Sequence, residues 1–280
     1  MHKFLLIDGH NLLFQMFYGM PSRIINQKGQ QIQGIVGLIG ALFKMIRQIH
    51  PTHILLVFDG EHENQRKNIS SDYKSNRIDY SLVSDVDSPF AQLPLIYKVL
   101  DYLKIPYIET KIYEADDLIA NYVNQYNDIE IVISSYDSDF FSLINEHVKI
   151  FRYRGKSSYF IDSAFIKNKL NIQPKQYTLF KSLIGDCADN IKGIYGIGPK
   201  TAANLISNYS TLEEFLNNTD KIKNEKFKTK VKDNIDLLQM NYSLIQFQHI
   251  SKLPFCMNEL VYKLDENITS TQVLHATSIW

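Results

Sequence analysis

The chain has 280 residues, enough for one large domain or two smaller ones, and its 30 basic and 30 acidic side chains cancel formally. Its two cysteines, Cys187 and Cys256, lie far apart and its eight histidines are scattered, which excludes a disulfide framework and a zinc site. Asp8 and His10 break the apolar N-terminal run and no stretch reaches transmembrane length, so we expect a cytoplasmic protein with no signal peptide and no membrane partner.

Three apolar runs predict buried strands of a mostly parallel sheet, and an acid follows each of them. The runs are residues 4–7 before Asp8, residues 54–58 before Asp59, and residues 131–133 shortly before Asp137. Because ligand sites form at the carboxyl ends of parallel strands, these acids are expected to lie together.

Helical periodicity links these strands. The predicted helices cover residues 11–18, 35–49, 93–103 and 114–126. Phe14, Phe17 and Tyr18 share one face of the first helix, and we interpret that face as core. Strands that alternate with helices predict an α/β fold, with a central mostly parallel sheet flanked by helices.

A polar segment from Glu61 to Phe90 interrupts this pattern. It lacks apolar periodicity and mixes acids with basic side chains. Such a segment is typical of a mobile projection above the sheet. The basic residues Arg66, Lys67, Lys74 and Arg77 lie in it, together with Tyr73.

Charge is segregated in the later part of the chain. Residues 101–139 carry nine acids against two lysines, residues 147–181 carry eight basic residues against one acid, and residues 221–232 contain six lysines. An acidic pocket beside basic flanks suits a polyanionic ligand. A solvated helix face explains the lysine-rich stretch equally well.

Residues 185–203 predict a tight glycine hairpin between two helices of a largely helical second half. The turn residues are Gly196 and Gly198, and the next helix begins with Pro199, Lys200 and Thr201. The free amides of that helix start can hold a phosphate. A packing turn alone would explain the glycines, but not Asp186 and Asp189 just upstream.

Nine acids fall in five short clusters. They are Asp8, Asp59, Glu114 with Asp116 and Asp117, Asp137 with Asp139, and Asp186 with Asp189. A single acid after a strand more often caps a helix than binds a metal. Three acids in one turn make a poor cap, because they repel one another. Converging carboxylates of this number require cations, and Mg²⁺ or Mn²⁺ prefers such ligands.

Five motifs, in order along nearly the whole chain, resemble the bacterial 5′-nuclease family. They are LIDG at 6–9, VFDG at 57–60, EADD at 114–117, DSD at 137–139 and GDCADNI at 185–191. Members of this family are flap-endonuclease relatives, found as the N-terminal domain of DNA polymerase I and as stand-alone exonucleases. The resemblance implies a PIN-like 5′-nuclease core over residues 1–175, with a helical arch at about 61–92, and a helical region over 176–280, with a helix–hairpin–helix at about 185–206.

The resemblance also implies site residues. Two divalent ions would be held by all nine acids, the first by Asp8, Asp59, Glu114 and Asp116 with Asp117 nearby, the second by Asp137, Asp139, Asp186 and Asp189. The arch would contact a single 5′ strand through Arg66, Tyr73, Lys74 and Arg77, with Lys74 and Arg77 also assisting catalysis. The hairpin would bind duplex DNA through Gly196, Gly198, Lys200 and Thr201, and could hold K⁺ on its carbonyls. Glu114 and Asp116 can converge only if Glu114 precedes the first full helical turn.

The implied activity is a structure-specific 5′-3′ exonuclease and flap endonuclease of DNA replication and repair. Two-metal hydrolysis would leave 5′-phosphates on DNA with a 5′ flap or 5′ end, with an RNA primer as a further substrate. The chain ends about 75 residues after the hairpin, so a stand-alone enzyme without an attached polymerase is expected. A monomer is also expected. The sequence departs from the family pattern at Gln15, Tyr136, Lys192 and Tyr195.

Two alternatives stay open at this point. A PIN-type ribonuclease has a similar acid cluster but is shorter and lacks the hairpin. A non-catalytic DNA-binding scaffold would keep the hairpin and lose the acids. Metal-dependent cleavage would separate these functions.

Overall fold

The computed structural model describes residues 2–60, 65–263, 265 and 267–280. A six-stranded sheet has the order β3-β2-β1-β4-β5-β6. Its strands are β1 Lys3–Asp8, β2 His53–Phe58, β3 Tyr107–Glu109, β4 Glu130–Ser134, β5 Val148–Arg152 and β6 Tyr159–Ile161. Every pair is parallel except β5 with β6. The predicted mostly parallel sheet is therefore confirmed.

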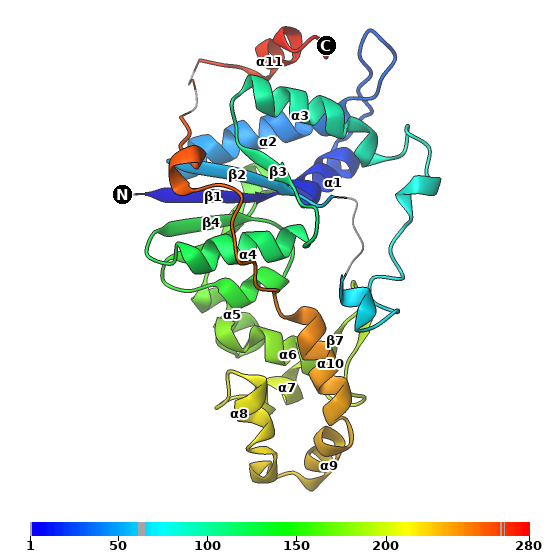
Figure 1. Ribbon diagram of the computed structural model, residues 1–280, viewed down its shortest axis with the longest axis vertical. Helices are drawn as coiled ribbons and strands as arrows, with labels where there is room; N and C mark the ends of the chain where they lie inside the picture. The colour runs from blue at the N-terminus through cyan, green and yellow to red at the C-terminus, as the bar shows by residue number, and fades with distance from the viewer. Residues whose placement is uncertain (1, 61–64, 264, 266) are drawn as a thin grey trace.

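Helices cover both faces of this sheet (Figure 1). One layer contains α1 Gly9–Gly19, α2 Gln33–Ile49, α3 Leu93–Tyr102 and α11 Ser270–Ala276, and the other contains α4 Ala115–Gln125 and α5 Ser163–Leu170. Side chains alternate along β1, so Leu5 and Ile7 pack in the first layer while Phe4 and Leu6 pack in the second. All four are fully buried, as the sequence predicted for a strand in a two-sided core.

The second half of the chain forms a helical region below the sheet (Figure 1). Its elements are α6 Tyr177–Ile184, the two-stranded β7 Gly185–Asp186 and β8 Ile191–Lys192, α7 Pro199–Leu205, α8 Leu212–Leu216, α9 Glu225–Asp233 and α10 Ile235–Ile245. Leu179 of α6 and Leu238 of α10 belong to the same buried cluster as Phe4 and Leu6 of the sheet. The helical region and the α/β core are thus joined by one continuous apolar core.

Short 3₁₀ helices supply most of the remaining regular structure. They are η1 Gln65–Asn68, η2 Tyr80–Leu82, η3 Pro89–Gln92, η4 Asp139–Leu143, η5 Gly155–Ser157, η6 Pro174–Gln176, η7 Thr219–Lys221 and η8 Met257–Leu260. The first three lie in the segment predicted as a helical arch. Residues 65–92 contain these single turns and no α-helix, while positions 61–64 lie outside the described residues. Within residues 65–92, the predicted arch is therefore built from short 3₁₀ turns and the loops between them.

The aromatic face of α1 is only partly core. Phe17 is buried, whereas Tyr18 is 58% exposed. Its ring contacts Phe14, and the Tyr18 hydroxyl lies 3.0 Å from the Tyr80 hydroxyl. The prediction of a fully buried face is therefore wrong at Tyr18, which faces the arch.

Within the described part of the chain, none of the helices combines the length and the apolar character that crossing a membrane requires.

Candidate active site

The predicted acids meet at the carboxyl edge of the parallel strands. Asp8 ends β1, Asp59 follows β2, and Asp137 lies shortly after β4. Glu114 is the N-cap of α4 and has an extended backbone, with φ −68° and ψ 152°. It therefore precedes the first helical turn, which confirms the condition for its convergence with Asp116.

Hydrogen bonds orient two acids of this edge. Asp8 is buried and accepts a hydrogen bond from the Ser135 hydroxyl at 2.9 Å. Asp59 accepts from the Ala115 N–H at 2.7 Å and lies 3.6 Å from Nδ1 of His10. Although burial acts to raise the pKa of Asp59, the hydrogen bonds from His10 and Ala115 lower it below its ordinary value. Asp59 is therefore ionised at neutral pH.

Mutual repulsion marks a group that we call the sheet-edge acids, namely Asp8, Asp59, Asp116 and Asp137. Burial, together with the charges of Asp59 and Asp137, raises the pKa of Asp8 to about 7. Burial and the charges of Asp137, Asp8 and Asp59 raise the pKa of Asp116 well above its ordinary value. Such clustering of charge is unfavourable unless a cation or protons neutralise it.

A second group, the hairpin-side acids, consists of Asp139, Asp186 and Asp189. Each offers a carboxylate oxygen, and these oxygens lie within 4.8 Å of one another. The Lys181 ammonium contacts both Asp139 and Asp186, the latter at 2.5 Å. Burial and the charge of Asp137 raise the pKa of Asp139 to about 7, even though Lys181 opposes that change. In this group, as among the sheet-edge acids, several carboxylates lie close together, and here the Lys181 ammonium neutralises part of their charge.

Lys181 is a site residue that the sequence analysis missed. Its side chain is 8% exposed, at the end of α6 nearest to Asp186. Although burial disfavours its charge, the Asp139 carboxylate raises the pKa of Lys181, which therefore stays protonated. A lone lysine in the apolar helix YTLFKSLI, one turn before an acid, is the signal that could have revealed it.

Asp117 has a different environment from the other acids. It is fully buried, and both of its oxygens accept hydrogen bonds from the Arg66 guanidinium, at 2.7 and 2.9 Å. Oδ1 also accepts the Gln248 N–H at 2.8 Å. Asp117 thus has a buried counter-ion, Arg66, which also donates to the neighbouring Glu114.

The arch residues contact acids. Lys74 Nζ lies 2.6 Å from Oε1 of Glu114, and Arg77 lies 2.8 Å from Oδ1 of Asp189. Tyr73 is buried, and its hydroxyl lies 3.3 Å from Oε2 of Glu114 and 3.4 Å from Oδ2 of Asp189, so that it can donate to either carboxylate. Lys74 and Arg77 were predicted to contact a 5′ strand and to assist catalysis, and in the structure each pairs with an acid that was predicted as a metal ligand. Tyr73 does not present an exposed ring for DNA.

The glycine hairpin projects Gly196, Gly198, Lys200 and Thr201 at the start of α7. Gly196 has φ +79°, a conformation that favours glycine. Lys200 is exposed and Thr201 is partly exposed. The carbonyl of Tyr195, at the tip, accepts a hydrogen bond from Nζ of Lys230 at 2.6 Å. The hairpin residues thus gather at one exposed loop.

A cavity of about 1330 Å³ lies between the acids and the arch. Asp59 and Glu114 line one side of it, with Lys74 and Arg77 beside them. Aromatic side chains also contribute, and none of these was predicted as a site residue: His10, Phe14, Tyr80, Phe90 and Tyr97. The cavity thus combines acids, cations and stacking surfaces.

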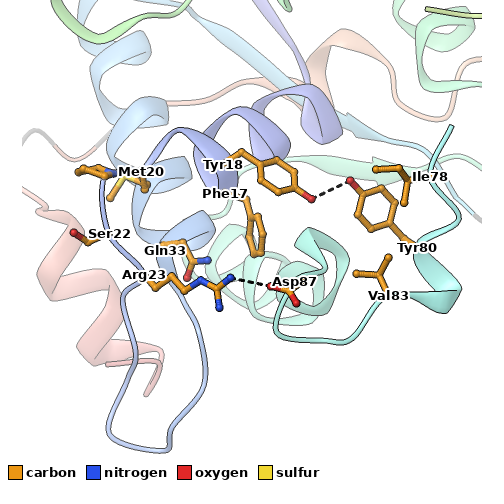
Figure 2. Close-up of a pocket in the computed structure, with 11 residues that line it drawn as sticks. Phe17, Tyr18, Met20, Ser22, Arg23, Gln33, Ile78, Tyr80, Val83 and Asp87 are labelled. Carbon is orange, nitrogen blue, oxygen red and sulfur yellow. Dashed lines mark hydrogen bonds and ion pairs between the residues drawn. The ribbon is translucent and has the colours of Figure 1, made fainter.

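A smaller cavity of about 410 Å³ adjoins the outer side of Tyr80 (Figure 2). Two polar links cross it, the Tyr18–Tyr80 hydroxyl pair at 3.0 Å and the Arg23–Asp87 ion pair at 2.8 Å. They connect residues 80–87 of the arch with α1 and the loop that follows it, and so hold this part of the arch in place.

Two family models match successive parts of the chain. The model described as "5′-3′ exonuclease, N-terminal resolvase-like domain" matches residues 3–171, and the model described as "5′-3′ exonuclease, C-terminal SAM fold" matches residues 172–267. The chain belongs to the 5′-3′ exonuclease family. A curated 5′-3′ exonuclease of Aquifex aeolicus is 30% identical over 243 residues, which are 86% of this chain and 80% of that protein. The prediction of a 5′-nuclease is thereby confirmed.

Further relatives of this 5′-3′ exonuclease family member include polymerases and solved nucleases. DNA polymerase I of Borreliella burgdorferi is 31% identical over 281 residues, and the match covers 99% of this chain but 30% of that polymerase. A structure of T5 5′-exonuclease with bound zinc has a TM-score of 0.69 at 19% identity, covering 87% of this chain and 89% of that one. The catalytic core of Rad2 in complex with DNA substrate has a TM-score of 0.60 at 17% identity, covering 99% and 87%. These structures confirm the predicted nuclease fold.

Two departures from the family pattern have structural partners in this 5′-3′ exonuclease. Gln15 donates its side-chain N–H to the carbonyl of Tyr153, and the Tyr136 hydroxyl donates to the same carbonyl at 3.0 Å. The Tyr136 ring also lies 5.4 Å from the guanidinium of Arg152. Gln15 of α1 and Tyr136 of the loop after β4 thus hydrogen-bond to the same residue, which directly follows β5.

The raised pKa values predict a pH-dependent stability without metal. Asp8 and Asp139 have pKa values of about 7 in the folded state, against 3.8 ordinarily. Folding therefore favours their protonated forms, and this contribution is lost as pH rises through 7. The unfolding temperature in EDTA should fall between pH 5.5 and pH 8. Calorimetry should show a flatter profile for Asp139→Asn, and an unchanged wild-type profile on adding Mg²⁺ would contradict the assignment.

Proposed function

We propose that this protein hydrolyses DNA phosphodiester bonds near a 5′ end or at a 5′ flap, leaving 5′-phosphates. The observation that supports this most directly is the crowding of acids at the carboxyl edge of the sheet, where the charges of Asp59 and Asp137 act on Asp8. The hairpin-side acids form a second cluster within 4.8 Å, and Lys74 and Arg77 contact acids of the site. The name of one structural relative records DNA substrate and that of another records bound zinc. Replication and repair, RNA primers as substrates and a monomeric state belong to the same proposal.

The chemistry of the acids fits divalent cations. The sheet-edge acids would hold one ion with Glu114, and the hairpin-side acids would hold another. Raised pKa values of Asp8, Asp116 and Asp139 indicate charge that is not fully compensated by the protein. When bound, Mg²⁺ or Mn²⁺ would supply an activated water and neutralise the charge on the departing oxygen.

The protein side chains would orient the substrate. Lys74 and Arg77 currently neutralise Glu114 and Asp189, and they would transfer to phosphates of the incoming strand as the acids bind metal. Tyr80 and Phe90 line the same cavity and offer faces on which a base can stack. The acids would position metals and would not attack the DNA, so no covalent intermediate is expected. Water would supply the oxygen of the new 5′-phosphate, and the 3′ oxygen would leave as a hydroxyl.

Product mapping tests the proposal. Flap, nicked, gapped and linear DNAs labelled at the 5′ end or internally would be incubated with Mg²⁺, Mn²⁺, Ca²⁺ or EDTA. We expect Mg²⁺-dependent products with 5′-phosphates, released near the junction of a flapped duplex. Binding without cleavage would support the scaffold, and preferential cleavage of single-stranded RNA would support a PIN-type ribonuclease.

The hairpin differs from the K⁺ site that the resemblance implied. The Lys230 ammonium already occupies the side of the hairpin at the Tyr195 carbonyl, and also lies 5.2 Å from the Tyr195 ring. A Cβ on Gly196 would approach Nζ of Lys230 to 2.4 Å. We therefore propose that Lys230 replaces a free K⁺ here as a tethered cation and assists binding of the duplex backbone.

This arrangement predicts how binding depends on monovalent ions. Wild-type affinity for duplex DNA should be equal in NaCl and KCl of the same ionic strength. Lys230→Ala should bind more weakly in NaCl and regain affinity in KCl. Lys200→Ala is the matched control, because it removes one exposed charge and should weaken binding equally in both salts, reducing the slope of log affinity against log salt by about one. The duplex affinities of both variants can be measured by fluorescence anisotropy. If Lys230→Ala lost affinity equally in the two salts, Lys230 would not take the place of K⁺.

A further inference from the structure

Arg66 was predicted to contact DNA from the arch, but the structure places it in the interior. Its side chain is 3% exposed, so it presents no charge to a passing strand. It lies in η1, at the base of the arch, between the start of α4 and the end of α10. Its role must therefore be sought in what it contacts.

All five N–H donors of the Arg66 guanidinium have acceptors. Nε donates to the Leu244 carbonyl at 2.8 Å, and one terminal nitrogen donates to Gln246 at 3.1 Å. The remaining donors go to both oxygens of Asp117 and to Oε2 of Glu114, at 2.7 to 2.9 Å. Lysine has three donors without this planar arrangement and cannot satisfy the same acceptors.

These contacts divide the Glu114 carboxylate between two kinds of partner. Oε2 is held by Arg66, a buried group that also bonds Asp117 of α4 and the carbonyls of Leu244 and Gln246 at the end of α10. Oε1 is held by Lys74, whose side chain is 12% exposed and borders the cavity. Replacing Lys74 by another cation therefore leaves the carboxylate oriented, because Arg66 still holds its other oxygen.

We infer that Arg66 is a positioning residue, which presents Glu114 to a divalent cation while Asp117 serves as its buried counter-ion. The inference rests on the proposed function, in which Glu114 is a metal ligand. Groups that orient a metal ligand typically contribute ten- to a hundredfold in metal affinity. The contacts with Leu244 and Gln246 place the same guanidinium at the carbonyl end of α10, where a positive charge is favoured.

A set of four variants tests this role by Mn²⁺ binding without DNA, measured by electron paramagnetic resonance and calorimetry. Arg66→Met and Arg66→Lys should bind Mn²⁺ about ten- to a hundredfold more weakly than wild type. Glu114→Gln is the control for loss of the ligand itself and should show a similar loss. Asp117→Asn alone keeps Arg66 on Glu114 and should retain most of the affinity.

A double variant separates positioning from stability. Arg66→Met leaves Asp117 as an unpaired buried charge and should lower the unfolding temperature. Arg66→Met combined with Asp117→Asn removes that charge and should recover much of the unfolding temperature, yet its Mn²⁺ affinity should stay low. Recovery of both would show that Arg66 is only structural and would overturn the inference. Absence of Mn²⁺ binding by the wild type would instead overturn the proposed function.

Discussion

Replacing Asp116 by alanine should lower turnover by several orders of magnitude and leave DNA binding intact or tighter. Asp116 lies among the sheet-edge acids, and the charges of Asp137, Asp8 and Asp59 raise its pKa. We propose that Asp116 is a metal ligand needed only for the chemical step, so its removal should stop that step and also reduce repulsion of phosphate. Asp139→Ala should give the same result from the hairpin-side acids.

Single-turnover cleavage and equilibrium binding, measured on the same labelled flap, check this prediction. Asp128→Ala is the matched control, because Asp128 is exposed just beyond the other end of α4. Its turnover should equal that of wild type. If Asp116→Ala also cleaved at a near-normal rate, the sheet-edge acids would not be the catalytic centre.

Joint replacement of Lys74 and Arg77 by alanine should slow flap cleavage far more than it weakens duplex binding. Both side chains border the cavity and contact acids that we propose as metal ligands. Without them a 5′ strand would lose the cations that direct its phosphates to the acids, while the hairpin would still bind the duplex. Glu114 and Asp189 would each lose an ion pair, so Mn²⁺ should bind more tightly without DNA.

The control for this variant is Lys67→Ala, which removes an exposed charge from the same 3₁₀ helix as Arg66. It should change neither cleavage nor Mn²⁺ affinity. A bulky complex placed on the 5′ end before mixing tests the path of the strand. If cleavage is blocked, the strand must thread through the arch from its free 5′ end. If cleavage is unchanged, the strand does not thread and passes beneath the arch from the side.

The strands that carry the first acids were predictable, because residues 4–7 and 54–58 are apolar runs that end in aspartate. Strands β3 and β6 were not predicted, since each has three residues and lies partly at the surface. In β5, Lys149 separates the apolar Val148 and Ile150. The sequence analysis therefore counted this segment as part of the basic stretch 147–181 and did not predict a strand. Edge strands depend on partners from elsewhere in the chain, and periodicity alone does not reveal these.

The candidate site, too, was only partly predictable from the sequence. Nine acids could be identified from motif spacing; seven of them form the two acid groups, and Glu114 and Asp117 both pair with Arg66. Arg66 and Lys74 look alike in the sequence, as cations of one polar segment. Burial separates them, because Arg66 meets carbonyls of α10 that lie about 180 positions away. Long-range acceptors of this kind leave no local signal.

The single apolar core shared by the sheet and the helical region has a geometric consequence. The two family models meet at residues 171 and 172, yet Leu179 and Leu238 pack in the same cluster as Phe4 and Leu6. Because close-packed interiors resist sliding, this boundary cannot act as a hinge. The hairpin and the acids would then stay at a fixed distance from each other. The incision should therefore fall at a constant number of nucleotides from the junction, whatever the length of the flap.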